Sequence, residues 1–449
     1  MTKYLLLPLL TVFFIGCNTP NKSEFTYFGG KIINPKGEYV VLFDNDKVID
    51  SIKLAPDNTF MGKFKGITPN LYYFKHGPEH QFVYLEPNDS LLIRLNTWDF
   101  DESLVFSGVN ADRNNALIET FLQNEVDHRN FYPYYSLPVK EFKQKIDSTQ
   151  QQKIAFLADY KKENKETSED FLSVLEIALT YPLYSKLEKF IIDNSQKKTP
   201  ELITDDFTNH RKIASINKDS LMFFGAYAEY VNSNLYSEVY QKISINKKED
   251  FTVNLLNDIN TKITSEELKN KLLRRATIRH FYDKSSCSIN QQAFDTFLKL
   301  STNTEDKDVI KKLLNDINSV TTSHKIPSFT LMGPEGALEK VEDLIKNKKT
   351  VIYFRNKKYS SDDWVAARIN YLIKNNPKTK FLVINIHNNK QYITNLDIKN
   401  QYYLNDSSKA HAFLTSEFPR IILVNEKGIV KNGFGALSSE KINQQITDL

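Results

Sequence analysis

Two short apolar runs near the end of the chain, separated by a segment of helical character, constrain the fold of this sequence more than any other feature. The runs KKTVIYF (348–354) and KFLVINIH (380–387) have the composition of buried strands. The segment between them, DDWVAARINYLIKNN (362–376), has the character of a helix. Two strands joined by such a helix are expected to lie parallel in one sheet. The C-terminal part of the chain is therefore predicted to be an α/β domain.

Two flanking segments resemble a known family. IPSFTLMGPEG (326–336) resembles the first hairpin of thioredoxin-like domains of the TlpA type, and FPRIILVNEKGIV (418–430) resembles a later hairpin of the same domains. The resemblance implies the order β-α-β-α-β-β-α over residues 323–449. It also places Pro419 at the position of the family's cis-proline, which faces the active site.

The active-site motif of that family is altered here. When the family pattern Phe-Trp-Ala-x-Trp-Cys-x-x-Cys is laid over FRNKKYSSD (354–362), Arg355 and Lys358 replace the tryptophans, and Tyr359 and Asp362 replace the cysteines. Disulfide exchange requires a thiolate and a second thiol. No cysteine occurs from 288 to 449, so we expect no catalytic residue and no disulfide reductase chemistry in this domain.

Two interpretations of the altered motif stay open. In the first, residues 360–363 (SSDD) only start a helix, because hydroxyl groups cap free N–H groups and carboxylates complement the helix dipole. In the second, the surface beside the proline is a groove for a peptide or another ligand, as the resemblance implies, and Arg355, Lys357 and Lys358 attract anions. The candidate binding residues of the second interpretation are Arg355, Lys358, Tyr359 and Pro419.

The N-terminus has the pattern of a secretion signal. Lys3 precedes YLLLPLLTVFFI (4–15), an apolar run too short to span a bilayer and typical of a signal peptide. FIGC (14–17) resembles the lipobox of bacterial lipoproteins, although Phe14 stands where leucine is usual. The resemblance implies a signal peptide at 1–16, a lipid on Cys17 and a tether at 17–24. We expect a membrane anchor in the bacterial cell envelope, on the outer membrane facing the periplasm; the alternative is ordinary cleavage with Cys17 incidental.

Cysteine content limits how the chain can be stabilised. Cys17 and Cys287 are the two cysteines of the sequence. If Cys17 carries lipid, Cys287 has no partner for an internal disulfide, although an envelope compartment would permit one. Stability is then expected to come from packing.

Short strands separated by turn-forming residues fill the segment from 25 to 112. The turns NPKG (34–37), DND (44–46), PDN (56–58) and EPND (86–89) separate runs rich in β-branched and aromatic residues. We predict strands at 39–43, 48–54, 71–74, 81–85 and 91–95. This spacing predicts an antiparallel β-sandwich. The segment also resembles the N-terminal domain of many Bacteroidota envelope lipoproteins.

Helical signals dominate from 113 to 322. Thr167 to Asp170 and Thr264 to Glu267 have the capping-box pattern of a helix start. Pro182 lies within an apolar helical run and is expected to kink or break it. We predict an all-α region here, which gives a multidomain fold of β-sandwich, helical region and thioredoxin-like domain.

Composition excludes some classes of function. The 449 residues include 59 basic and 55 acidic ones, a net charge of +4, so no nucleic-acid partner is expected. His76 and His80 flank Gly77-Pro78, which rules out a zinc site on a helix. No metal and no cofactor are expected.

These observations favour a lipid-anchored envelope protein with a redox-inactive thioredoxin-like domain that acts as a binding or scaffolding module rather than as an enzyme. One alternative is a TlpA-like thiol-disulfide oxidoreductase, which the fold alone would favour. Another is an accessory lipoprotein that captures peptides or glycans through aromatic residues of the sandwich. The aromatic residues considered for that platform are Tyr72, Tyr73, Phe74 and Trp98.

Overall fold

A computed structural model describes residues 25–245, 250–286 and 289–449. The chain forms two compact units, residues 1–234 (unit 1) and 235–449 (unit 2). The division falls inside the region expected to be helical and within helix α5 (Gly225–Ile245). The expected signal peptide, the tether, Cys17 and Cys287 lie outside the described residues.

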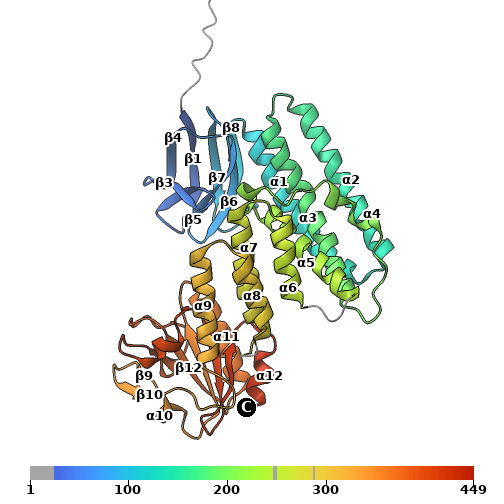
Figure 1. The fold of residues 1–449 in the computed structure, drawn as a ribbon. Helices are drawn as coiled ribbons and strands as arrows, with labels where there is room; N and C mark the ends of the chain where they lie inside the picture. Colours follow the sequence, from blue (N-terminus) through green and yellow to red (C-terminus); the bar gives the residue numbers. More distant parts are fainter. Residues whose placement is uncertain (1–24, 246–249, 287–288) are drawn as a thin grey trace, which may run out of the picture. The chain divides into compact units, whose positions relative to one another are not determined.

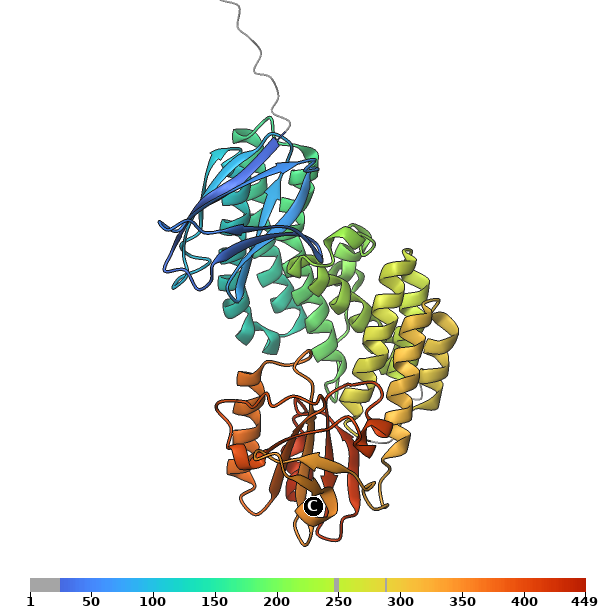
Figure 2. The ribbon, with the colours of Figure 1, turned by 90° about the vertical axis from the view of Figure 1, so that its left-hand side faces the viewer.

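Unit 1 begins with two β-sheets packed face to face (Figures 1 and 2). Their strand orders are β4-β1-β7-β8 and β3-β2-β5-β6. Side chains from both sheets, among them Phe28, Leu42, Phe74 and Leu91, meet in one core. The strands are β1 (Phe25–Ile33), β2 (Tyr39–Asp44), β3 (Lys47–Lys53), β4 (Thr59–Lys65), β5 (Asn70–His76), β6 (Glu79–Leu85), β7 (Ser90–Asn96) and β8 (Val105–Val109). Buried and exposed residues alternate along β4 and β7, as in strands with one face on a core.

The turns predicted between these strands are confirmed. Each holds an asparagine with a positive φ: Asn34, Asn45, Asn58 and Asn88. Asparagine adopts this left-handed conformation more readily than most residues because its short polar side chain bonds to nearby backbone.

The expectation of a purely antiparallel sandwich is wrong at one strand pair. β1 and β7 run parallel, with Phe28 opposite Leu91, whereas β1·β4, β7·β8 and the pairs of the other sheet are antiparallel. Tight hairpins force antiparallel pairing, but β1 and β7 are joined by a long path through five other strands. Local sequence patterns therefore carry no information on their relative direction.

The helices of unit 1 follow the sandwich. They are α1 (Ala111–Phe131), α2 (Val139–Glu163), α3 (Glu169–Ser195), the short α4 (Asp205–Thr208), the start of α5, and the 3₁₀ turns η1 (Tyr132–Ser136), η2 (Asn209–Lys212) and η3 (Asp219–Leu221). Helix α1 contacts β6 and β8, and α3 contacts β5. The helical region predicted after residue 113 thus begins against the sandwich.

Helix α3 does not break at Pro182, contrary to one of the two expected outcomes. Proline has no N–H group, so the carbonyl of Ala178, four residues earlier, has no partner within the helix. Asn124 of α1 donates its side-chain amide to that carbonyl at 2.9 Å. A side chain from a neighbouring helix therefore replaces the missing backbone donor.

Two predicted helix starts are displaced by one residue. Ser168, not Thr167, is the N-cap of α3, and its hydroxyl accepts the Phe171 N–H. Ser265, not Thr264, is the N-cap of α7 (Glu266–Lys284), and it accepts the Leu268 N–H. Both threonines precede a serine that can make the same bond, and the pattern alone does not choose between two adjacent hydroxyl groups.

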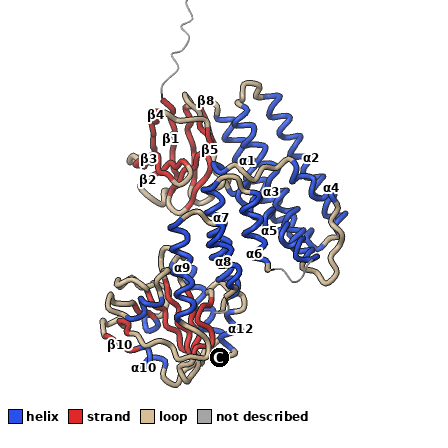
Figure 3. Tube along the Cα trace, in the orientation of Figure 1, coloured by secondary structure: helices blue, strands red, loops and turns tan. Residues whose placement is uncertain are grey.

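Unit 2 contains helices followed by one sheet (Figure 3). After α5 come α6 (Phe251–Lys262), α7, α8 (Gln291–Leu300) and α9 (Thr304–Ser319). The sheet has seven strands in the order β10-β9-β13-β12-β11-β14-β15. They are β9 (Thr330–Met332), β10 (Leu338–Lys340), β11 (Thr350–Arg355), β12 (Lys380–Asn385), β13 (Gln401–Tyr403), β14 (Arg420–Val424) and β15 (Val430–Gly435). The remaining helices are α10 (Val341–Ile345), α11 (Asp362–Asn375), α12 (Ile442–Thr447) and the 3₁₀ turns η4 (Ile398–Asn400) and η5 (Lys409–Phe413).

The predicted crossover is confirmed: β11 and β12 are parallel and α11 joins them. Alternate residues of β11 face two different cores. Val351 and Tyr353 pack with residues of α11 and α12, whereas Ile352 and Phe354 pack with Phe329 on the other face. Strands buried on both faces explain why this part of the sequence is so uniformly apolar.

In the parts of the chain that the structure describes, no helix combines the length and the apolar composition needed to cross a membrane.

Candidate functional site

The altered motif lies where β11 ends and α11 begins. Ser361 is the N-cap of α11, and its hydroxyl accepts the Trp364 N–H at 3.4 Å. Asp362 and Asp363 occupy the first turn, where carboxylates complement the positive end of the helix dipole. The helix start predicted at 360–363 is confirmed.

An ion pair between a buried guanidinium and a partly exposed carboxylate occupies the place where the aligned family motif has a tryptophan and the second cysteine. Arg355 is 2% exposed, and its guanidinium pairs with the carboxylate of Asp362. Its Nη1 also donates to the Gln391 carbonyl at 3.1 Å. A buried guanidinium needs such partners, because an unpaired charge in the interior is strongly unfavourable. The expectation that Arg355 attracts an anionic ligand at an open groove is therefore not met, since its charge is neutralised within the domain.

Tyr359 and Lys358 remain accessible. Tyr359 is 41% exposed, and its ring lies 5.0 Å from that of Phe418, the neighbour of Pro419 in sequence. Lys358 is exposed. Burial of part of the ring raises the pKa of the Tyr359 phenol, so it stays neutral near pH 7. The structure thus brings Tyr359 to the segment of Pro419, as the motif alignment implied.

The expected cis bond at Pro419 is absent: no cis peptide bond occurs among the described residues. The cis assignment came from the family resemblance alone, and most X–Pro bonds in folded proteins are trans. Glu417, two residues earlier, has a φ of 58°, so the chain turns there through a left-handed residue.

Helix α7 occupies the backbone beside Pro419. Tyr282 donates its hydroxyl to the Pro419 carbonyl at 3.0 Å, and its ring packs against Phe418 and Phe434. Burial raises the pKa of Tyr282, which keeps its hydroxyl protonated as a donor. The resemblance places extended peptides at this surface, but a helix of the same chain makes the contact here.

The end of α7 adds a second contact with the same sheet. The carbonyl of Ser285 accepts the Asn432 side-chain amide at 2.6 Å, and its hydroxyl accepts the Ala436 N–H at 3.1 Å. The end of α7 is therefore fixed to the residue before β14 through Tyr282 and to β15 through Ser285.

Helix α9 holds the loop that leads to Pro419. The Asp316 carboxylate accepts hydrogen bonds from the N–H and hydroxyl groups of both Thr415 and Ser416, at 2.5 to 2.9 Å. Arg420 is 1% exposed and donates to the carbonyls of Asp316 and Phe413. These bonds leave the loop little freedom to adapt to a ligand.

The aromatic platform considered on the sandwich does not form as a unit. Tyr72 and Phe74 are 2% and 0% exposed and lie in the core of the sandwich. Tyr73, on the opposite face of β5, stacks on Phe43 at 4.7 Å. Successive strand residues point to opposite faces, so the three neighbours cannot share one surface. Trp98 is 75% exposed and stands apart from that core.

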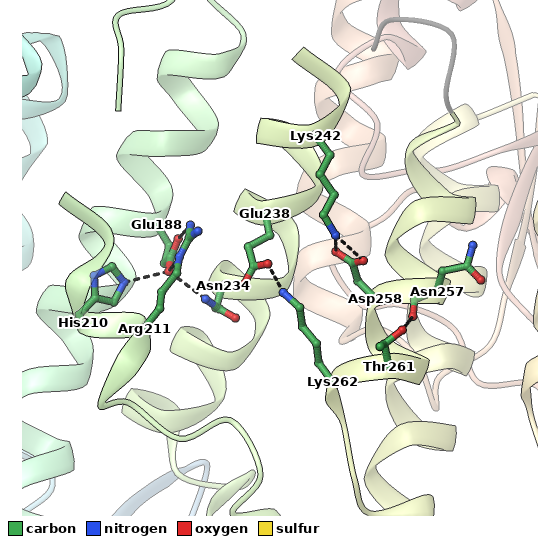
Figure 4. A network of polar contacts seen from close by, with 10 residues as sticks. All are labelled: Glu188, His210, Arg211, Asn234, Glu238, Lys242, Asn257, Asp258, Thr261 and Lys262. Carbon is green, nitrogen blue, oxygen red and sulfur yellow. Dashed lines mark hydrogen bonds and ion pairs between the residues drawn. The ribbon is translucent and has the colours of Figure 1, made fainter. Parts of the chain in front are cut away.

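A buried acidic residue that sequence reasoning missed organises part of unit 1 (Figure 4). Glu188 is fully buried and accepts hydrogen bonds from His210, Arg211 and Asn234 at 2.5 to 3.0 Å. Burial opposes its ionisation, but the bonds from Arg211 and His210 outweigh that effect and lower its pKa to about 2. One feature of the sequence indicates this cluster: Glu188 is an acidic residue within the apolar run that forms α3.

Figure 4 also shows two ion pairs between α5 and α6 in unit 2. Lys242 contacts Asp258 at 2.6 Å, and Lys262 pairs with Glu238. These pairs, like the hydrogen bonds of the Glu188 cluster, are explained by helix packing. Within the described ranges, His, Cys, Asp and Glu side chains form no group of three that could hold a metal ion.

The comparisons with known proteins concern solved structures. No protein-family profile and no curated protein matches the sequence. A thioredoxin-like protein from Bacteroides caccae is 13% identical with a TM-score of 0.28, and the match covers 59% of this chain and 93% of that one. The thioredoxin domain of a thiol-disulfide oxidoreductase from Bacteroides vulgatus is 20% identical with a TM-score of 0.21, over 25% of this chain and 88% of that one.

A thiol:disulfide interchange protein from Bacteroides sp. is likewise 20% identical with a TM-score of 0.21, over 25% of this chain and 81% of that one. Similarities of this extent say nothing about activity. The strand order and the β11–α11–β12 crossover themselves make the C-terminal domain an α/β fold.

Proposed function

We propose that this chain is a lipid-anchored protein of the bacterial cell envelope whose thioredoxin-like domain is redox-inactive and serves as a binding or scaffolding module. The observation that carries the proposal is the ion pair between buried Arg355 and Asp362, the residue at the position of the second cysteine. The anchor on Cys17 and the periplasmic face of the outer membrane belong to the proposal through the sequence FIGC.

The chemistry of the pair supports the loss of redox activity. A phenol at 359 and a carboxylate at 362 cannot form a mixed disulfide. Asp362 also neutralises a buried guanidinium, so its carboxylate has a structural task that a thiol could not perform.

The contacts of α7 and α9 support a scaffolding role. Both helices bond to the segment around Pro419, through Tyr282 and Asp316. The domain thus binds helices of its own chain at the surface where the resemblance places peptides. For a peptide or protein partner, the accessible residues of the predicted groove are Lys358 and Tyr359.

Turnover of a disulfide substrate tests the proposal. Purified protein and its Cys287→Ala variant are incubated with insulin and a thiol donor, with a thioredoxin as positive control. We expect no reduction above the rate without protein. Reduction that persists in Cys287→Ala would support the oxidoreductase alternative instead.

A further inference from the structure

We propose that a cavity in unit 1, lined by Lys186, binds a small molecule that has an apolar body and a single carboxylate group. The proposal goes beyond the function above because it concerns a different unit. It holds whether or not the C-terminal domain is redox-inactive.

The cavity has a volume of about 250 Å³ and lies between β6, α1, α3 and the first residues of α5. Its walls are largely apolar and include Phe82, Leu117, Phe121 and Phe224. The rings of Phe82 and Phe224 pack edge to face at 5.0 Å. Pockets that hold small molecules combine such apolar walls with a few polar groups.

Two of the polar residues that line the cavity already form hydrogen bonds with other residues of the protein. Asn124 donates to the Ala178 carbonyl beside Pro182 and accepts a hydrogen bond from Lys153 at 2.8 Å. Gln81 donates to the Asp101 carboxylate at 2.8 Å. These side chains shape the cavity, and their main hydrogen-bonding groups are already used.

Lys186 differs from them. It is 7% exposed, and among the described residues its ammonium makes no hydrogen bond or ion pair; the ammonium lies 5.7 Å from the centre of the Phe131 ring. Lys153, which is 4% exposed, shows the usual arrangement, because its ammonium pairs with Asp127 at 2.7 Å. Burial lowers the pKa of Lys186, and the carboxylates of Glu229 and Asp127 partly offset this effect. An ammonium on a side chain this buried, without a direct partner, is stabilised when a further negative charge lies in contact with it.

A carboxylate on a bound molecule would supply that charge and form a strong, charge-assisted hydrogen bond. The apolar body of the molecule would lie against the phenylalanine and leucine walls. Glu125 and Glu229 also line the cavity and are exposed. Their carboxylates repel negative charge on a ligand, so one carboxylate held by Lys186 is tolerated better than two. The residues therefore favour an apolar monocarboxylate over a dicarboxylate.

Titration calorimetry with two probes of the same shape tests the inference. The probes are 3-phenylpropionate and its uncharged amide, 3-phenylpropanamide. We expect the wild type to bind the acid at least tenfold more tightly than the amide, and Lys186→Met to abolish that difference. Lys189→Met, an exposed lysine on the same helix, is the matched control and should bind as the wild type does.

Two further measurements separate binding from folding. Lys186→Met should unfold at the same temperature as the wild type or higher, because methionine suits an apolar site better than an unpaired ammonium. Ala226→Phe places a ring in the cavity and should abolish binding of the acid while Lys186 is intact.

Several results would overturn the proposal. They are the absence of binding by the wild type at millimolar probe, equal binding of acid and amide, and binding in Ala226→Phe equal to wild type. A marked loss of thermal stability in Lys186→Met alone would assign the lysine a structural role instead.

Discussion

At the scale of single residues, this chain has a carboxylate where the motif it resembles has sulfur. Asp362, which aligns with a cysteine of that motif, neutralises Arg355. The same device recurs in unit 1, where Arg113 is held by Asp89 and Glu86. Removing one member of such a pair leaves the other charged and buried, which costs more than the pair itself contributes.

The Arg355–Asp362 pair gives a direct prediction. Asp362→Ala should lower the free energy of unfolding of the C-terminal domain by about 3 kcal/mol. Asp363→Ala, which loses only an exposed carboxylate of the same helix turn, should cost about 0.5 kcal/mol. Urea denaturation of the two variants measures the difference. The double variant Arg355→Met/Asp362→Leu should recover most of the loss; equal effects of the two single substitutions would contradict a structural role for the pair.

The lowered pKa of Glu188 predicts that the stability of unit 1 depends on pH. Its pKa is lowered to about 2 from an ordinary value of 4.5, so its contribution is complete above pH 4.5 and disappears as the pH falls towards 2. Glu188→Gln should therefore be less stable than wild type by about 3 kcal/mol at pH 7, and the gap should narrow below about pH 4.5. Unfolding by urea at pH 7, 4 and 3 tests this, with the exposed Glu163→Gln as control. A gap that stays constant with pH would show that the charge of Glu188 is not the cause.

At the scale of elements, the sequence allowed more to be predicted than at the scale of contacts. Strands and turns of the sandwich follow local alternation and asparagine positions, so they were predictable. The parallel pairing of β1 with β7 was not, because it joins residues more than sixty positions apart. The altered motif could be aligned residue by residue, but the burial of Arg355 and the contact of Tyr282 could not. Tyr282 lies 137 residues before its acceptor, and no local pattern records such a contact.

Removing the Tyr282 hydroxyl group tests how much its hydrogen bond contributes to the packing of α7 on the sheet. Tyr282→Phe keeps the ring but removes the donor to the Pro419 carbonyl, and it should destabilise unit 2 by about 1 kcal/mol. Tyr371→Phe, half-exposed on α11, should have little effect. Hydrogen exchange of the α7 and β14 amides, together with denaturant unfolding, reports the change. If both variants behave alike, the hydroxyl bond contributes nothing to docking.

At the scale of the whole molecule, the chain forms two compact units, and its N-terminal sequence has the pattern of a signal peptide and a lipid anchor. Acyl chains contribute about 0.8 kcal/mol per buried CH₂, so several chains hold a protein firmly at a membrane. None of the described helices is long and apolar enough to cross a membrane. On the proposal above, membrane attachment is expected to depend on Cys17, because FIGC has the lipobox pattern.

Detergent partitioning tests that dependence. The wild type and Cys287→Ser should enter the detergent phase, and Cys17→Ser should remain in the aqueous phase because it cannot be lipidated. Radiolabelled fatty acid should label the first two proteins only. Partitioning of Cys17→Ser into detergent would refute the lipoprotein assignment.

The bonds from Asp316 also bear on the order in which unit 2 can be completed during synthesis. The residues bonded to Asp316 come 99 to 104 positions later in the chain. While a ribosome is still adding those residues, α9 carries a carboxylate with no amides to bind, and the edge of β11 that β14 later covers is open. A nascent chain that stalls before Arg420 would therefore leave the edge of β11 unpaired. Such an edge is accessible to proteases. Formation of a stable unit 2 should consequently depend on translation of the residues from Arg420 onward.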